Sequence, residues 1–145
     1  MNVFKSPAWN RLERNWQNGF DTLTLYEQET IALYWLETET MNGTLDQFFW
    51  NSSGDMAMLA VSGLNRVQAP LTLAALTSAL AVFGDQYSLE RTERHAALEV
   101  IEDQYGPDVF LDASRIIQDL PEDFVLAAVE QLATLYAQQD RSRAA

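Results

Sequence analysis

The stretch Asn42–Asp55 constrains the fold more than any other, because it places three adjacent bulky aromatic residues between two glycines. Gly43 is typical of a helix end, where glycine adopts the left-handed backbone conformation at little cost. Thr44 and Gln47 have the spacing of a capping box that opens a new helix. Gly54 is expected to end this helix. The stretch therefore predicts a turn–helix–turn hub, whose aromatic residues are Phe48, Phe49 and Trp50.

Helix start and stop signals recur through the rest of the chain. Ser6 and Pro7 have the pattern of an N-cap followed by a first-turn proline, and Thr24 with Glu27 forms a second capping box. The helix that this box opens is expected to reach about Met41, and its apolar residues lie almost all round it, which is typical of a central helix covered by others. Later helices are expected to start at Asp55, Pro70, Ser88 and Pro121, with a short one at about 112–118.

No segment shows the strict alternation of apolar and polar residues that indicates a strand. We therefore predict an all-α fold: a single compact domain over 1–145, with about seven or eight helices around the turn–helix–turn hub. A chain of 145 residues that is 48% hydrophobic is large enough to bury a core of this kind.

Composition also bears on where the protein works. The chain has no cysteine, which excludes disulfides, a thiol nucleophile and thiolate metal sites. The first residues lack the apolar run of a signal peptide. The longest apolar stretch, 69–83, is too short to cross a bilayer and is interpreted as a buried core helix. We expect a cytoplasmic protein with no membrane partner.

The net charge of −12 arises from 21 acidic residues against nine Lys and Arg residues. Such a chain is repelled by nucleic acids and by anionic membranes, and attracted to basic partners. We therefore expect no direct nucleic-acid binding. The alternative is that the charge serves only to keep the protein in solution.

The acidic residues are concentrated in two parts of the chain. Between positions 15 and 65 there are seven and no Lys or Arg: Asp21, Glu27, Glu29, Glu37, Glu39, Asp46 and Asp55. Between 99 and 123 there are eight, against Arg115 alone: Glu99, Glu102, Asp103, Asp108, Asp112, Asp119, Glu122 and Asp123. Glu99 with Asp103, and Asp119 with Asp123, have the spacing that places like charges together on one helix face. Carboxylates arranged in this way resemble a row of phosphates, and a solvated helix face is the alternative interpretation.

The sequence offers little support for catalysis or a cofactor. His95 is the single histidine, and Thr92 stands where the Glu of a Glu-x-x-His di-iron motif would be. A zinc motif would require a second histidine. The segment 52–54 lacks the pattern of a nucleophile elbow. We therefore expect no metal and no cofactor, and we expect His95 to be an exposed or salt-bridged surface residue.

The segment 39–55 resembles the signature of a bacterial family that was once described only as a domain of unknown function. The family is now named after an acidic DNA-mimic protein. Its signature is an acid-rich helix, Asn-Gly-Gly, Gln-Phe/Tyr-Phe and Asn-x-x-Gly. The resemblance covers about 20–85, and Thr44 stands where the family has a second glycine. The matching residues are Glu39, Asn42, Gly43, Gln47, Phe48, Phe49, Asn51, Gly54 and Asp55.

This resemblance implies an all-helical, dimeric, non-enzymatic protein whose acidic surface occupies the DNA-binding face of a basic protein, such as a helix-turn-helix transcription factor. The eight acids between 99 and 123 then bind the partner. The motif residues are interpreted as structural: Asn42, Gln47 and Asn51 satisfy backbone groups at helix ends, while the aromatic residues fix the hub. Two alternatives stay open. One is an interaction module without mimicry, such as an immunity-type inhibitor of a toxin, and the other is an enzyme with a carboxylate pair.

Overall fold

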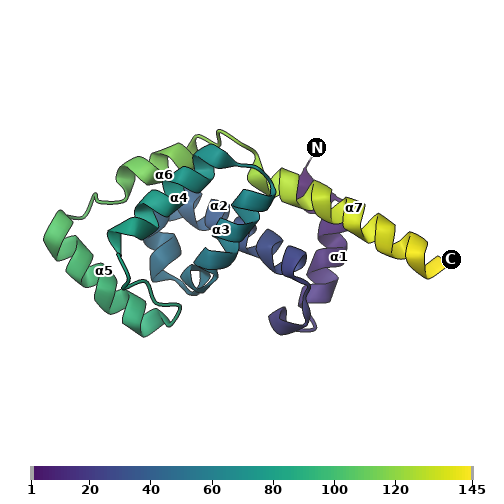
Figure 1. Ribbon diagram of the computed structural model, residues 1–145, viewed down its shortest axis with the longest axis horizontal. Helices are drawn as coiled ribbons and strands as arrows, with labels where there is room; N and C mark the ends of the chain where they lie inside the picture. The colour runs from purple at the N-terminus through teal and green to yellow at the C-terminus, as the bar shows by residue number, and fades with distance from the viewer. Residues whose placement is uncertain (1, 145) are drawn as a thin grey trace.

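The computed structural model describes residues 2–144, which fold into seven α-helices and three short 3-10 segments (Figure 1). The described residues contain no strand, so the all-α prediction is confirmed. The α-helices are α1 Pro7–Trp16, α2 Leu25–Trp50, α3 Ala57–Arg66, α4 Pro70–Val82, α5 Arg91–Tyr105, α6 Leu111–Gln118 and α7 Phe124–Ala144. The 3-10 segments are Val3–Lys5, Phe20–Thr22 and Ser52–Met56. The two end residues of the expected domain, Met1 and Ala145, lie outside the described range.

The long helix α2 is the centre of the fold. It begins with the predicted capping box, in which the Glu27 carboxylate accepts a hydrogen bond from the Thr24 amide at 3.0 Å and the Thr24 hydroxyl accepts one from the Glu27 amide at 3.3 Å. It packs against α3, α5, α6 and α7, while α1 and α7 lie together at one end of the molecule and α5 at the other (Figure 1). The expectation of a central helix is therefore confirmed.

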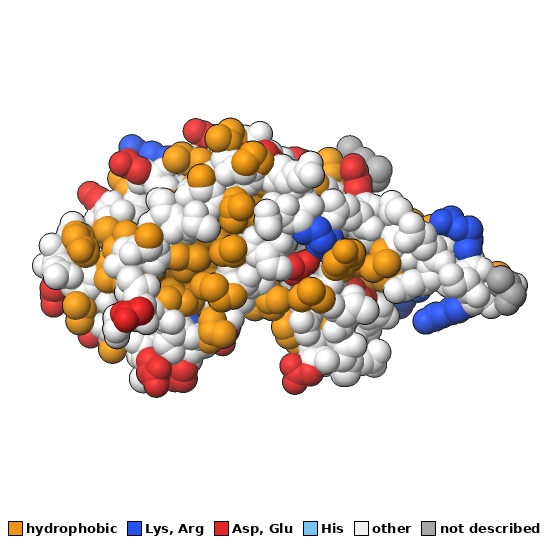
Figure 2. All heavy atoms as spheres, in the orientation of Figure 1, with side chains coloured by type: hydrophobic (Ala, Val, Ile, Leu, Met, Phe, Trp, Pro, Cys, Tyr) orange, Lys and Arg blue, Asp and Glu red, His pale blue; other side chains and the backbone are white. Residues whose placement is uncertain are grey.

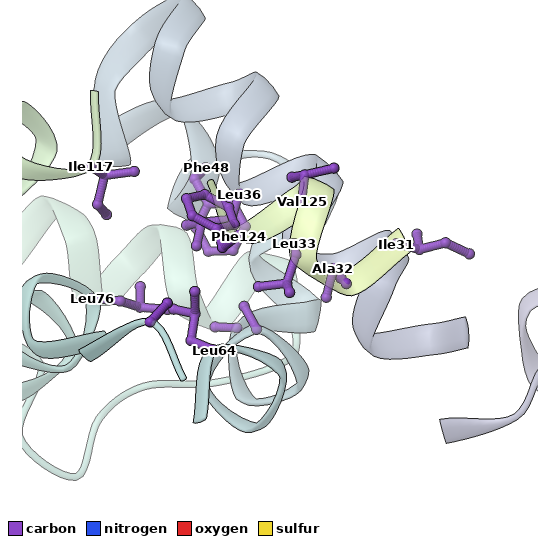
Figure 3. Close-up of a cluster of buried hydrophobic side chains, with 14 of the residues drawn as sticks. Ile31, Ala32, Leu33, Leu36, Phe48, Leu64, Leu76, Ile117, Phe124 and Val125 are labelled. Atoms are coloured by element: carbon purple, nitrogen blue, oxygen red, sulfur yellow. The ribbon is translucent and has the colours of Figure 1, made fainter. Parts of the chain in front are cut away.

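The hydrophobic core forms where α2 meets the helices around it (Figure 3). Both parts of α2 contribute fully buried side chains, among them Leu33, Leu36 and Phe48. The surrounding helices add further buried side chains to the same cluster, among them Leu64 from α3, Leu76 from α4, Ile117 from α6, and Phe124 and Val125 from α7. Because both parts of α2 enter one core, their relative orientation is fixed by packing as well as by the backbone.

The predicted break before the hub is a kink inside α2. Gly43 has φ −157° and ψ 31°, and Thr44 has φ 64° and ψ −178°, so the helical geometry stops at these two residues and resumes after them. The left-handed residue was expected at Gly43, and this was wrong, because Thr44 is the residue with positive φ. The Leu45 amide donates to the Ser114 hydroxyl at 2.9 Å, which ties the second part of α2 to α6.

Two other predicted helix starts are also corrected. Ser88 does not cap α5. The N-cap is Glu90, whose carboxylate accepts hydrogen bonds from the Thr92 and Glu93 amides. These contacts hold the pKa of Glu90 below its ordinary value. The last helix begins at Phe124, three residues after the proline that was expected to open it.

Candidate functional site

The second part of α2 is held by a buried carboxylate that lies across the kink. Glu39 is only 9% exposed, and its Oε2 accepts hydrogen bonds from the side-chain amides of Gln47 and of Asn51, the latter at 3.2 Å. A Cβ on Gly43 would overlap the Gln47 carboxamide, so the glycine leaves room for this contact. The side chains of Gln47 and Asn51 were expected to satisfy backbone groups at helix ends. This was wrong, because both side-chain amides donate to the Glu39 carboxylate. Asn42 is exposed.

A buried arginine from α5 binds backbone carbonyl groups at the C-terminal end of α2. The Arg94 side chain is fully buried, and its guanidinium donates to the carbonyl oxygens of Phe49 at 2.6 Å, Asn51 at 2.9 Å and Ser88 at 2.9 Å. It also forms an ion pair with Asp55 at 2.9 Å. The last carbonyl groups of a helix lack hydrogen-bond donors within the helix, and the negative end of the helix dipole favours a cation. Arg94 supplies both the donors and the positive charge.

Asp55 was expected to cap α3, and this was wrong, because α3 has no side-chain cap and the carboxylate pairs with Arg94. Gly54 is also needed for a different reason than a helix stop. A Cβ at this position would lie 2.7–2.9 Å from the Arg94 guanidinium, so only glycine leaves the arginine its place. The Gly54 carbonyl oxygen accepts a hydrogen bond from the Tyr87 hydroxyl, and burial raises the pKa of that phenol.

Two more side chains from α5 reach the same end of α2. Arg91 Nε donates to the Trp50 carbonyl oxygen at 3.0 Å, and His95 Nε2 lies 2.6 Å from the same oxygen. The His95 imidazole stacks on the Trp50 indole, with 3.6 Å between ring centroids and 6° between planes. His95 is therefore a partly buried residue of the α2–α5 junction, and its expected role as an exposed or salt-bridged residue is corrected.

Much of the first group of acids lies inside the protein. The buried Glu27 carboxylate accepts hydrogen bonds from the Tyr136 hydroxyl at 2.6 Å and from the Asn15 amide at 2.8 Å. Burial alone would raise the pKa of Glu27, but the hydrogen bonds outweigh it and hold that pKa below its ordinary value. Glu29 is buried and pairs with Arg66 at 2.7 Å. These acids stabilise helix packing and add little to the surface charge.

The second group of acids, predicted to bind a partner, lies along α5, α6 and the segments that join them to α7. All are exposed except Glu122, which is partly buried. Three of them lie on α5, Asp108 lies in the loop before α6, and the others lie on α6 or between α6 and α7: Asp112, Asp119, Glu122 and Asp123. On the face drawn in Figure 2, acidic side chains occur as small separate groups, with hydrophobic side chains between them.

Glu122 has a structural role that the sequence did not reveal. Its carboxylate accepts hydrogen bonds from the Leu71 amide at 2.7 Å, the Thr72 amide at 3.0 Å and the Thr72 hydroxyl at 2.6 Å. It therefore caps the first turn of α4 from a distant part of the chain. Burial alone would raise the pKa of Glu122, but these hydrogen bonds outweigh it and hold that pKa below its ordinary value.

The two predicted like-charge pairs differ in the structure. Glu99 and Asp103 both lie within α5, one turn apart as expected. Asp119 and Asp123 do not share a helix, because Asp119 follows the end of α6 and Asp123 precedes α7. Asp123 lies close enough to α2 for its charge to add to the effect of burial in raising the pKa of Glu37.

The structure brings two predicted acids together at a pocket of about 380 Å³ beside α5. Glu99 and Glu102 line it from α5, and Asp46 lines it from the second part of α2. Asp46 belongs to the first group of acids and was not assigned to partner binding. Its place beside Glu99 depends on the α2–α5 junction, for which the sequence carries no local signal.

The described residues show no metal centre and no membrane-spanning helix. Within 2–144, no three His, Asp or Glu side chains are placed to hold a metal ion. No helix in the same range is both long and apolar enough to cross a bilayer.

Comparison with models of known protein families gives a match. A family model described as DMP19-like protein matches residues 21–140, which is well over half of the chain. The matched region extends far beyond the 20–85 segment that carries the resemblance in sequence, and it includes α5, α6 and most of α7. Searches of curated proteins and of solved structures find no match.

Proposed function

Because the chain belongs to the DMP19-like family, we propose that it is a non-enzymatic, DNA-mimic-type protein. Its acidic surface binds the DNA-binding face of a basic protein, such as a helix-turn-helix transcription factor. The observation that carries this proposal is the exposure of seven of the eight acids between 99 and 123, a segment with Arg115 as its one basic residue. The proposal is consistent with a family that is not known to contain enzymes.

The arrangement of charge suits recognition by a basic groove. A net charge of −12 steers a positively charged protein toward the chain and repels DNA itself. Arg94, Arg91 and His95 anchor the start of α5 to α2, so the acids on α5 are held on a fixed helix. Charges that are already in place lose less conformational entropy when a partner binds.

We also infer a homodimer, as the family resemblance implies, and α4 supplies a surface that favours it. The segment 70–84 has no charged residue, and Leu71, Ala74, Ser78 and Ala81 form an exposed stripe along α4 at helical spacing. Figure 2 shows hydrophobic side chains over the middle of the face where α3 and α4 lie in Figure 1. Two chains of charge −12 repel each other least where a charge-free face meets its copy.

Affinity capture from a cell lysate at low and high salt tests partner binding, with bound proteins identified by mass spectrometry. The first variant neutralises four of the predicted partner-binding acids through Glu99→Gln, Asp103→Asn, Asp119→Asn and Asp123→Asn. A matched control carries the same change in net charge at other exposed acids: Glu13→Gln, Asp21→Asn, Asp85→Asn and Glu130→Gln. Four exposed pairs at about 0.4 kcal/mol each amount to about a tenfold loss of affinity for the first variant, and the control should retain most of the binding.

The expected result is a basic DNA-binding protein that elutes with salt and is displaced by duplex DNA. Equal loss of this protein in both variants would show that net charge alone matters and would contradict the assignment of the site. Capture of a non-basic partner that resists salt would contradict mimicry and favour the interaction module, such as an immunity-type inhibitor of a toxin.

A further inference from the structure

The pocket beside α5 has an apolar floor and an acidic rim. Its floor is formed by Leu98, Ile101, Val109 and Phe110, of which all but Val109 are buried. The carboxylates of Asp46, Glu99 and Glu102 stand around it, and they come from two different helices. Among the described residues that line the pocket there is no Lys or Arg, so the acids have no basic partner within it.

Trp50 forms an aromatic wall of the same pocket. Its side chain is 43% exposed although it belongs to the hub, and it is held in place by the His95 imidazole stacked on one face. Trp50 lines the pocket and His95 does not, so the pocket meets a part of the indole that the stacked imidazole leaves uncovered. An indole that is open in this way attracts a cation above its ring.

We propose that this pocket receives an arginine side chain of a protein partner, an inference that rests on the proposed function and specifies where the contact is made. The methylene groups of an arginine match the apolar floor, while its head reaches the acidic rim. A guanidinium is planar, stacks on an aromatic ring and binds carboxylates through paired hydrogen bonds. A lysine ammonium is compact and strongly hydrated, so it fits the carboxylates but not the indole wall.

Thr44 acts as a positioning residue for this pocket. Its hydroxyl donates to Asp46 Oδ2 at 2.7 Å, which orients the carboxylate that α2 contributes to the rim. Thr44 holds a positive φ that favours glycine, so its side chain is present at a conformational cost. The hydrogen bond to Asp46 gives that side chain a role which glycine cannot fill.

The test uses the full chain and a small probe, N-acetyl-arginine amide, at millimolar concentrations. Two-dimensional NMR follows the Trp50 indole, which is assigned with Trp50→Phe. We expect saturable shifts at Trp50 and at the backbone amides of Glu99 and Glu102, and weaker shifts with N-acetyl-lysine amide. Asp46→Asn with Glu102→Gln should weaken binding about tenfold, because two charged contacts are lost. Thr44→Gly should weaken it by a smaller factor.

Val109→Trp fills the pocket without changing any charge and should abolish the shifts. The matched control is Ile116→Trp, which adds the same bulk at an exposed position on α6 and should leave the shifts unchanged. Thermal unfolding checks that both variants are folded. A Val109→Trp variant that fails to fold leaves Asp46→Asn with Glu102→Gln to decide the outcome.

Four results would overturn the inference. The first is a lack of saturable shifts with the arginine probe. The second and third are shifts of equal size with the lysine probe or with N-acetyl-leucine amide. The fourth is a set of shifts that appear when the protein concentration alone is raised and that disappear in the double variant Arg141→Gln with Arg143→Gln. The last result would assign the pocket to a second copy of the chain. Lysate capture does not enter this test, so the pocket can fail while a basic partner is still recovered, and the reverse can also occur.

Discussion

At the scale of single residues, Thr44 is the position where sequence and conformation conflict most. A threonine with φ 64° and ψ −178° occupies a region that glycine adopts freely and that costs other residues about 1–3 kcal/mol. Thr44→Gly removes this strain but also removes the hydrogen bond to Asp46 and adds chain entropy to the unfolded state. We expect a net gain of about 1 kcal/mol in the free energy of unfolding, measured in urea.

Thr38→Gly is the matched control for this prediction, because Thr38 is exposed and lies in the regular part of α2. Glycine at that position should cost about 0.3–0.5 kcal/mol, because threonine is itself a poor helix former. If Thr44→Gly and Thr38→Gly lower the stability by the same amount, the positive φ at Thr44 carries no strain and the prediction is contradicted.

The residues of the hub also show what a single sequence can reveal. The box of Thr24 with Glu27 was predicted correctly, because its two members lie one helical turn apart and the contact is local. Arg94 was assigned no role from the sequence, yet its side chain is fully buried. Its partner Phe49 is 45 positions away, and no pattern in the chain links the two. Gly54 was recognised as important, but the reason for it depends on the same distant arginine.

At the scale of helices, the start of α4 depends on the segment before α7. Glu122 binds the Leu71 and Thr72 amides, so Glu122→Gln should lower the free energy of unfolding by about 1 kcal/mol at neutral pH, as for loss of an N-cap. The folded-state pKa of Glu122 is lowered, so its contribution is present above the unfolded-state pKa of about 4.3 and is lost as the pH falls through the folded-state value. Urea unfolding of both proteins between pH 7 and pH 3 measures this difference.

The difference between wild type and Glu122→Gln should therefore shrink as the pH falls. Glu130→Gln changes an exposed acid on α7 and should show little difference at any pH. A difference for Glu122→Gln that stays constant across this range would mean that the cap does not depend on the carboxylate charge.

Some helix boundaries are set by local sequence and were predicted, whereas others depend on the folded structure and were misplaced. The kink in α2 and the 3-10 segment that follows it were foreseen as breaks in the helix because glycine marks both places in the sequence. The N-cap of α5 was misplaced by two positions, since Ser88 and Glu90 are both suitable capping residues and only the folded backbone selects one. The prediction that Asp119 and Asp123 share a helix face also depended on a helix boundary. It was wrong, because α6 ends before Asp119 and α7 begins after Asp123.

At the scale of the whole molecule, exposed acids occur on several helices, whereas the α4 stripe carries no charge and α7 ends in two arginines. Figure 2 shows Lys and Arg side chains at the far end of α7, where Arg141 and Arg143 are exposed. The stripe along α4 has no charge, and we expect it to join two copies. Ser78→Arg should convert the dimer to a monomer in analytical ultracentrifugation, because an arginine without a partner would be buried in the contact.

Gln138→Arg is the control, since it adds the same charge at an exposed position on α7 and should leave the dimer intact. A wild-type chain that sediments as a monomer at all concentrations would contradict the dimer. A Ser78→Arg chain that remains dimeric would contradict the assignment of α4 as its surface.

The burial of Arg94 has a consequence for how the chain is made. The segment 20–85 carries the most recognisable residues, but the carbonyl oxygens of Phe49 and Asn51 have their hydrogen-bond donor in a guanidinium that emerges from the ribosome later. A nascent or truncated chain that stops before Arg94 leaves these oxygens without that donor and leaves a gap beside Gly54. We therefore expect the recognisable segment not to fold on its own, and we expect the hub to close only after synthesis has continued into α5.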